Sequence, residues 1–118
     1  MKKKFIFCFD LDGTVCATKG NKYKDARPIK KKVKFINQLF ENGHTIKIFT
    51  SRFMGRNQDN VRKAKKQGYK FTKNQLRKWN LKYHLLIMGK PSFDYMIDDK
   101  SLNFNKNWEK KLKSLIKI

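Results

Sequence analysis

The chain has 118 residues, with 30 Lys and Arg against nine Asp and Glu, for a formal net charge of +21. This length fits one domain over residues 1–118, and ten Phe, four Tyr and two Trp argue against intrinsic disorder. No apolar stretch approaches membrane-spanning length, and the apolar run 5–9 is too short for an export signal. We therefore expect a cytoplasmic protein with no membrane partner.

The basic excess has two interpretations. A strongly positive surface attracts nucleic acid, anionic lipid or phosphorylated substrates. Alternatively, the excess of Lys over Arg reflects codon bias, because Asn, Ile and Phe are also frequent and the lysines occur along the whole chain. We favour codon bias, since charge alone fixes no partner, and do not expect specific nucleic-acid binding.

The first predicted element is a strand over residues 5–9, whose five apolar residues fit a strand buried on both faces. It leads directly into Asp10, Asp12 and Gly13, where the glycine permits a tight turn. Two carboxylates this close are tolerated best when they hold a divalent cation or share a proton.

Helices and strands alternate over the rest of the chain. Pro28 is placed to open a helix that Gly43 ends, and 45–49 reads as a strand ending at Thr50. A short basic helix over 59–67 is expected to stop at Gly68, and the capping-box spacing of 72–75 predicts the start of another. Two more strands (84–88 and 95–97) and a last helix over 106–116 complete the pattern.

This alternation predicts an α/β fold with a parallel sheet of about four strands and right-handed crossovers. Ligands of such sheets bind beyond the carboxyl ends of the strands. Asp10, Thr50, Lys90 and Asp98 each end or follow a predicted strand. We therefore expect these four side chains to form one site, although they lie far apart in sequence.

The motifs resemble those of the haloacid-dehalogenase (HAD) superfamily of phosphotransferases. Residues 10–14, Asp-Leu-Asp-Gly-Thr, match its first motif, Thr50 the second, Lys90 the third, and Asp98-Asp99 the fourth, in the same order over residues 5–99. The resemblance implies a three-layer, Rossmann-like HAD fold and a phosphoric monoester hydrolase. No cap domain is expected, because only a short loop separates the first motif from the first helix.

The resemblance also implies a role for each residue. Asp10 would be the nucleophile that forms an aspartyl-phosphate, and Asp12 the group that protonates the leaving oxygen and then activates water. Mg²⁺ would be held by Asp10, the backbone carbonyl of Asp12, and Asp98, with Asp99 in support. Thr50 and Lys90 would bind phosphate oxygens. Leu11, Ser51, Arg52 and Arg56 are candidate substrate-binding residues.

Simpler interpretations remain for single residues. Asp12-Gly13 could be only a turn, Thr50 or Asp98-Asp99 only caps, and Lys90 one more surface lysine. Substrate contact by Arg52 and Arg56 is weighed evenly against a solvated loop. Cys8 and Cys16 fit neither a disulfide framework nor a zinc pattern, and no role is assigned to Asp94, His44 or His84.

The expected substrate is a small phosphorylated molecule. The segment 89–100, Gly-Lys-Pro-Ser-Phe-Asp…Ile-Asp-Asp-Lys, resembles cap-less phosphatases of bacterial surface-polysaccharide pathways, which implies a sugar or sugar-acid phosphate. Two alternatives stay open: a polynucleotide 3′-phosphatase of the same fold, favoured by the charge and by Thr50-Ser51-Arg52, and a basic nucleic-acid-binding module without activity. An oligomer that completes the open site is also left open.

Overall fold

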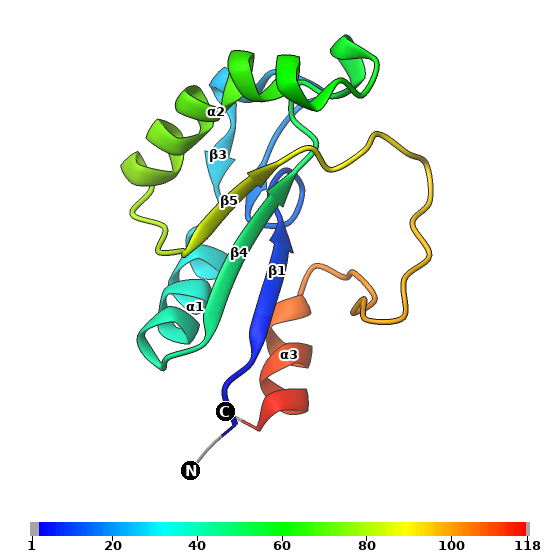
Figure 1. Cartoon of the computed structure of the whole chain (residues 1–118). Coiled ribbons are helices and arrows are strands. Elements are labelled where there is room, and N and C mark those ends of the chain that lie inside the picture. The colour runs from blue at the N-terminus through cyan, green and yellow to red at the C-terminus, as the bar shows by residue number, and fades with distance from the viewer. Residues whose placement is uncertain (1–2, 118) are drawn as a thin grey trace.

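The computed structural model describes residues 3–117, which form an α/β fold around one parallel sheet. The sheet has three strands in the order β1 (Ile6–Asp10), β4 (Thr45–Thr50) and β5 (Leu85–Met88), all pointing the same way (Figure 1). Asp10 pairs with Phe49 in the register of β1 and β4, and Thr50 pairs with Met88 in that of β4 and β5. The last residues of the three strands therefore lie at one edge.

Three α-helices accompany the sheet: α1 (Lys30–Glu41), α2 (Val61–Lys78) and α3 (Trp108–Ile116). The face of α1 that carries Val33, Ile36 and Leu39 packs onto the strands, as its 3.6-residue periodicity predicts. Trp108 of α3 contacts Phe9 of β1 and the buried Phe35 of α1, with ring centroids 5.2 and 5.9 Å apart. Helix α3 therefore lies on the same face of the sheet as α1.

The opposite face of the sheet is the main difference from the expected three-layer architecture. Along β1 and β5, buried and exposed residues alternate, and Ile6, Leu85 and Ile87 are 68%, 50% and 36% exposed. Such alternation is typical of a sheet covered on one face only. Within residues 3–117 no helix covers this second face, so the described fold has two layers.

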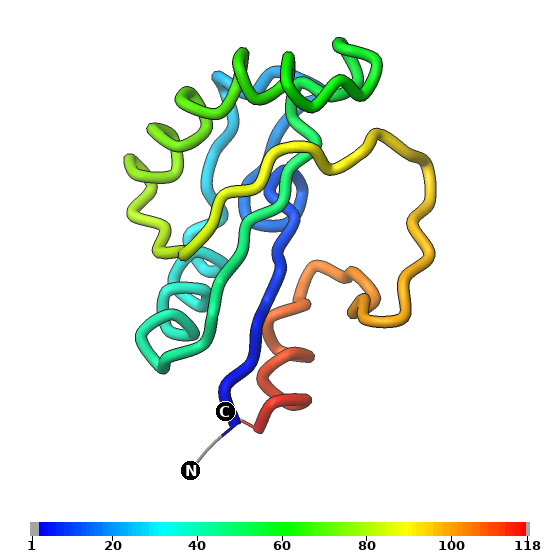
Figure 2. Tube along the Cα trace, in the orientation of Figure 1, coloured from blue at the N-terminus to red at the C-terminus, as the bar shows by residue number. Residues whose placement is uncertain are grey.

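The predicted fourth strand over 95–97 is also absent from residues 3–117. The chain leaves the sheet after β5 and runs as an irregular segment from residue 89 to 107, to one side of β1 (Figure 2). Tyr95 and Ile97 are 89% and 97% exposed there. Their composition favours a strand, but they pair with no other strand, and β1 stays the outermost strand on its side of the sheet.

The region 61–78 is one continuous helix, which corrects the expected break at Gly68 and the helix start at Thr72. Both residues are buried in the middle of α2. A Cβ atom at Gly68 would lie 2.2 Å from the Phe53 ring, so the glycine makes room for that ring. Phe53 itself has a φ of 68°, which is strained for a bulky residue.

Short elements complete the fold. Two antiparallel strands of two residues each, β2 (Cys16–Ala17) and β3 (Arg27–Pro28), pair with one another. Two 3₁₀ turns, η1 (Tyr23–Asp25) and η2 (Gly55–Asn57), lie in loops. The Nδ1 atoms of His44 and His84 accept bonds from the backbone N–H groups of Phe5 and Ile46. These bonds give both histidines a structural role. None of the helices in 3–117 is long and apolar enough to cross a membrane.

Candidate active site at the carboxyl edge of the sheet

Asp10 is the centre of the candidate site. It is the last residue of β1, and its side chain is 36% exposed. The Nζ atom of Lys90, which follows β5, lies 3.3 Å from its Oδ1 atom. Burial raises the pKa of Asp10, and the ammonium group of Lys90 opposes that rise. The pairing favours the charged carboxylate, which is the form that can act as a nucleophile.

Thr50 lies beside this pair as the last residue of β4 and is almost fully buried. The backbone N–H of Arg52 donates to its hydroxyl oxygen at 3.1 Å, which fixes the hydroxyl while leaving its proton available to a ligand. The backbone N–H of Lys90 donates to the Thr50 carbonyl at 3.1 Å. Three of the four expected strand-end residues therefore meet at one edge, as the topology predicts.

Asp12 has a different environment from Asp10. Arg52 binds it with two parallel bonds, from Nε to Oδ2 and from Nη2 to Oδ1, both 2.8 Å long. The Thr18 hydroxyl donates to Oδ1 at 2.5 Å. Burial favours the neutral acid, but the bonds from Arg52 and Thr18 outweigh it and hold the pKa of Asp12 below its usual value. Asp12 is therefore held as a carboxylate.

Arg52 is itself held by residues that the sequence gives no reason to associate with it. Its side chain is buried, and its Nη1 atom donates to Oε1 of Gln75 in α2 at 2.6 Å. The Nε2 atom of Gln75 donates to the carbonyl of Tyr23 at 2.8 Å. The guanidinium also lies over the Tyr23 ring, 4.9 Å from its centroid. A chain of contacts thus connects Asp12 to α2 and to η1.

The remaining substrate-binding candidates are divided by the structure. Leu11 has a fully buried side chain, so only its backbone can face a ligand, and its carbonyl already accepts from the N–H of Val15. Arg52 points to Asp12 instead of the open edge. Ser51 is half-buried between Thr50 and Arg52, whereas Arg56 is exposed and lies over the Phe53 ring, 4.5 Å from its centroid. Ser51 and Arg56 are thus the candidates that solvent can reach.

Asp98 and Asp99 do not join the site. Both are exposed in the irregular segment 89–107, where Asp98 accepts from the N–H of Lys100 and the hydroxyl of Ser101, each at 3.3 Å. Residues 3–117 contain no group of three His, Cys, Asp or Glu side chains placed to hold one metal ion. Lys90 and Arg52 neutralise the two carboxylates instead. The described arrangement does not fit a Mg²⁺ ion, and we derive no chemical step through one.

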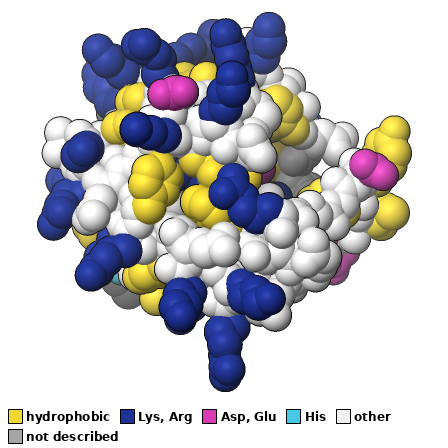
Figure 3. Space-filling model, turned by 90° about the horizontal axis from the view of Figure 1, so that it is seen from above, with side chains coloured by type: hydrophobic (Ala, Val, Ile, Leu, Met, Phe, Trp, Pro, Cys, Tyr) yellow, Lys and Arg dark blue, Asp and Glu magenta, His cyan; other side chains and the backbone are white. Residues whose placement is uncertain are grey.

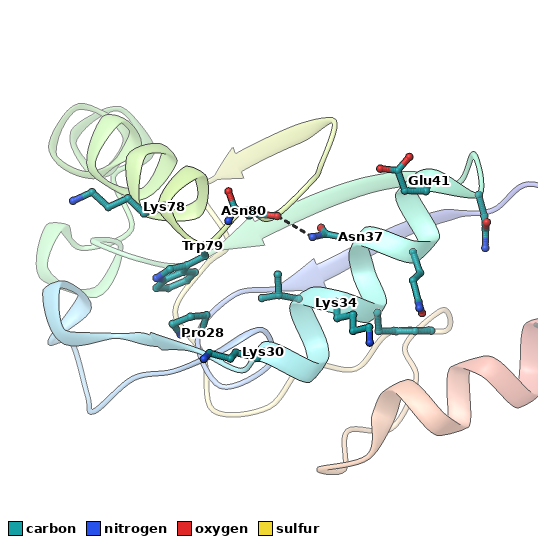
Figure 4. A pocket seen from close by; sticks show the side chains of 12 residues that line it. Pro28, Lys30, Lys34, Asn37, Glu41, Lys78, Trp79 and Asn80 are labelled. Atoms are coloured by element: carbon teal, nitrogen blue, oxygen red, sulfur yellow. Dashed lines mark hydrogen bonds between the residues drawn. The ribbon is translucent and has the colours of Figure 1, made fainter.

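A groove lies away from these residues, between α1 and the end of α2. It has a volume of about 860 Å³, and Pro28, Trp79, Lys30, Lys34 and Lys78 are among the residues that line it (Figure 4). A bond from Asn37 Nδ2 to the Asn80 carbonyl, 2.8 Å long, joins its two sides. The groove is open and contains none of the candidate catalytic residues.

Comparisons with known proteins inform the fold alone. No protein-family model matches this sequence, and no curated protein is significantly similar to it. The chain is similar to the crystal structure of a target protein from Vibrio cholerae, with 23% identity over 98% of each chain and a TM-score of 0.76. At this identity the likeness extends to the backbone arrangement and not to an activity.

Proposed function

We propose that this protein is a phosphatase that hydrolyses a phosphate monoester at Asp10. The observation that carries the proposal is the meeting of Asp10, Thr50 and Lys90 at the ends of three parallel strands, with Lys90 3.3 Å from Asp10. Phosphoryl transfer depends mainly on positioning and charge neutralisation. A nucleophilic carboxylate beside an ammonium and a hydroxyl donor supplies both.

In the proposed reaction, an oxygen of Asp10 attacks phosphorus and the bond to the ester oxygen breaks. Lys90 and Thr50 stabilise the phosphate oxygens, and the leaving oxygen takes a proton from solvent water at the open end of the sheet. Water then attacks the aspartyl-phosphate, which releases inorganic phosphate and restores Asp10. Because Arg52 and Thr18 hold Asp12 as a carboxylate, Asp12 suits the second step, in which it accepts a proton from that water.

The proposed substrate is a sugar or sugar-acid phosphate of surface-polysaccharide biosynthesis, as the resemblance of segment 89–100 implies. Mg²⁺ dependence is a separate proposal that rests on the resemblance of the motifs alone. The described positions do not form an oxygen site, so Asp98 would have to approach Asp10 to complete one. The open edge, which no cap domain covers within residues 3–117, accepts a bulky substrate or a second subunit.

The test is hydrolysis of p-nitrophenyl phosphate and of a panel of sugar phosphates, nucleotides and 3′-phosphorylated oligonucleotides. Asp10→Asn should abolish turnover, whereas Asp25→Asn, an exposed acid in η1, should not. Turnover that survives Asp10→Asn would overturn the assignment. Assays in EDTA, followed by added Mg²⁺, test the metal separately: full activity in EDTA would remove Mg²⁺ from the proposal and leave Asp10 in place.

A further inference from the structure

Helix α2 carries the most one-sided charge in the molecule. Eight of its 18 residues are Lys or Arg and none is acidic. The absence of acids continues on both sides, because no Asp or Glu occurs in the 34 residues from 60 to 93. In Figure 1, α2 lies at the end of the sheet toward which the strands point. Viewed from above that end, Lys and Arg side chains surround much of the surface, with few carboxylates among them (Figure 3).

Five of these residues form a single stripe along α2. Lys63, Lys66, Lys70, Lys73 and Arg77 follow the spacing i, i+3, i+7, i+10 and i+14, which places them on one side of a helix. All five are exposed, and the buried residues of α2 lie on the other side. The stripe is about 21 Å long at 1.5 Å per residue.

No carboxylate of the described residues compensates the charge of this stripe. None of the five side chains forms an ion pair with a carboxylate in residues 3–117. Neighbours three or four apart on a helix repel when their charges are alike, and the stripe contains four such pairs. Codon bias accounts for many lysines, but not for a helix face from which every acid is missing. A bound polyanion would relieve the repulsion.

Aromatic rings also lie around α2, outside the stripe itself. Phe71 of α2, Phe53 and Tyr23 form a half-buried cluster with ring centroids 6.4 and 5.1 Å apart. The exposed Arg56 covers the Phe53 and Tyr23 rings. Near the other end of α2, Trp79 lines the groove with Lys78, Lys30 and Lys34 (Figure 4). Cationic tracks with aromatic or Arg planes at intervals are typical of single-strand binding.

We infer that the stripe Lys63, Lys66, Lys70, Lys73 and Arg77 binds single-stranded nucleic acid, with bases stacking on the aromatic and Arg planes that lie around α2. This inference does not depend on the proposed phosphatase activity. The apolar side of α2 is buried in the core, so the helix has no apolar face to insert into a membrane. Contacts between the stripe and the phosphates would supply the affinity. Stacking on the aromatic and Arg planes would supply a preference for unpaired bases.

The test is fluorescence anisotropy of a labelled 20-residue oligothymidylate over a range of salt concentrations. Five phosphate contacts predict a slope of log K against log[salt] of about −3.5. The variant with Lys63, Lys66, Lys70 and Lys73 changed to Gln should bind at least about tenfold more weakly, with a slope reduced by about 2.8. A control with Lys100, Lys106, Lys110 and Lys111 changed to Gln has the same net charge, 21 − 4 = +17, and should bind within about twofold of the wild type.

Equal losses in the two variants would overturn the inference, because net charge alone would then drive binding. The wild-type protein gives a second test that needs no variant. Inorganic polyphosphate has the charge of a nucleic acid without its bases and should compete less well than the oligothymidylate at equal phosphate concentration. Equal competition by polyphosphate, or tighter binding to anionic lipid vesicles, would replace nucleic acid with another polyanion.

Discussion

Replacing Gly68 with Ala is expected to destabilise the protein, although the same change in an unobstructed helix would stabilise it. Alanine is favoured over glycine inside a helix by about 1 kcal/mol. At this position, however, the new Cβ atom would lie 2.2 Å from Cδ2 and 2.4 Å from Cε2 of Phe53. Overpacking of this kind costs about 1–3 kcal/mol, so the net effect ranges from about neutral to a loss of about 2 kcal/mol.

A double-mutant cycle isolates the clash. In a Phe53→Ala background the obstruction is gone, and Gly68→Ala should then stabilise by about 1 kcal/mol. The coupling between the two sites should therefore be about 1–3 kcal/mol, measured as the free energy of unfolding in urea. The control is the m-value, which should stay constant if all four proteins unfold in two states.

Two results would refute this reasoning. If Gly68→Ala stabilises the wild type as much as the Phe53→Ala variant, the Phe53 ring does not occupy the space above Gly68. If Gly68→Ala destabilises both backgrounds equally, the glycine is needed for its own backbone conformation, as at the end of a helix. A coupling energy of the expected sign arises only if α2 is continuous through Gly68 and the Phe53 ring packs against it.

Four further predictions concern the site and its surroundings. On p-nitrophenyl phosphate, Asp12→Asn should retain more activity than Asp10→Asn, because it removes only the proton acceptor of the second step and leaves the nucleophile in place; equal losses would contradict the separate roles. Arg52→Met should destabilise by about 1–3 kcal/mol because it leaves the Asp12 carboxylate unpaired, and Arg52→Lys should restore only part of this, since Lys lacks the bidentate fork. Burial opposes ionisation of Glu109, but the bond from Lys32 dominates and lowers the pKa of Glu109 to about 2. The ionised Glu109 should therefore stabilise the folded protein above its usual pKa of 4.5, and this stabilisation should be lost as the pH falls toward 2. Glu109→Gln should flatten the dependence of the unfolding free energy on pH in that range. A thiol reagent should modify the exposed Cys8 first, because Cys16 is buried and burial raises its pKa to about 11; modification of both at equal rates would argue against this packing.

The sequence is sufficient to predict those strands and helices whose apolar residues, spaced as the pattern requires, do pack into the core. The strands β1, β4 and β5 and the helices α1 and α3 lie close to their expected positions, because each has one face of apolar residues in the core. The expected burial of the first strand on both faces is wrong, since Ile6 is exposed on the uncovered face. The break expected at Gly68 is wrong for a tertiary reason: the glycine accommodates a ring 15 positions earlier in the chain. The local sequence alone cannot distinguish a glycine that ends a helix from a glycine that leaves room for a side chain packed against the helix.

The candidate site divides in the same way. The rule that ligands bind at the carboxyl ends of parallel strands brings Asp10, Thr50 and Lys90 together from sequence alone. The pairing of Arg52 with Asp12, 40 positions apart, needs the fold, and it changes the interpretation of Arg52 from a substrate ligand to a residue that holds Asp12. Gln75 carries no sequence signal for this contact: the spacing 72–75 reads as a capping box, whereas Gln75 lies inside α2 and binds Arg52.

The predicted role of Asp98 as a metal ligand depends on the predicted strand over residues 95–97. Two arguments from the sequence place this acid beside Asp10: residues 95–97 read as a strand next to the other three, and Asp98-Asp99 match the fourth motif of the HAD resemblance. In the described fold this segment pairs with nothing, its apolar residues Tyr95 and Ile97 are exposed, and β1 keeps a free edge. A free edge and an exposed apolar segment are both unfavourable in water. The position of Asp98 thus depends on whether its neighbours pair with the sheet, and pairing of 95–97 beside β1 would bring Asp98 to the end of the sheet that holds Asp10.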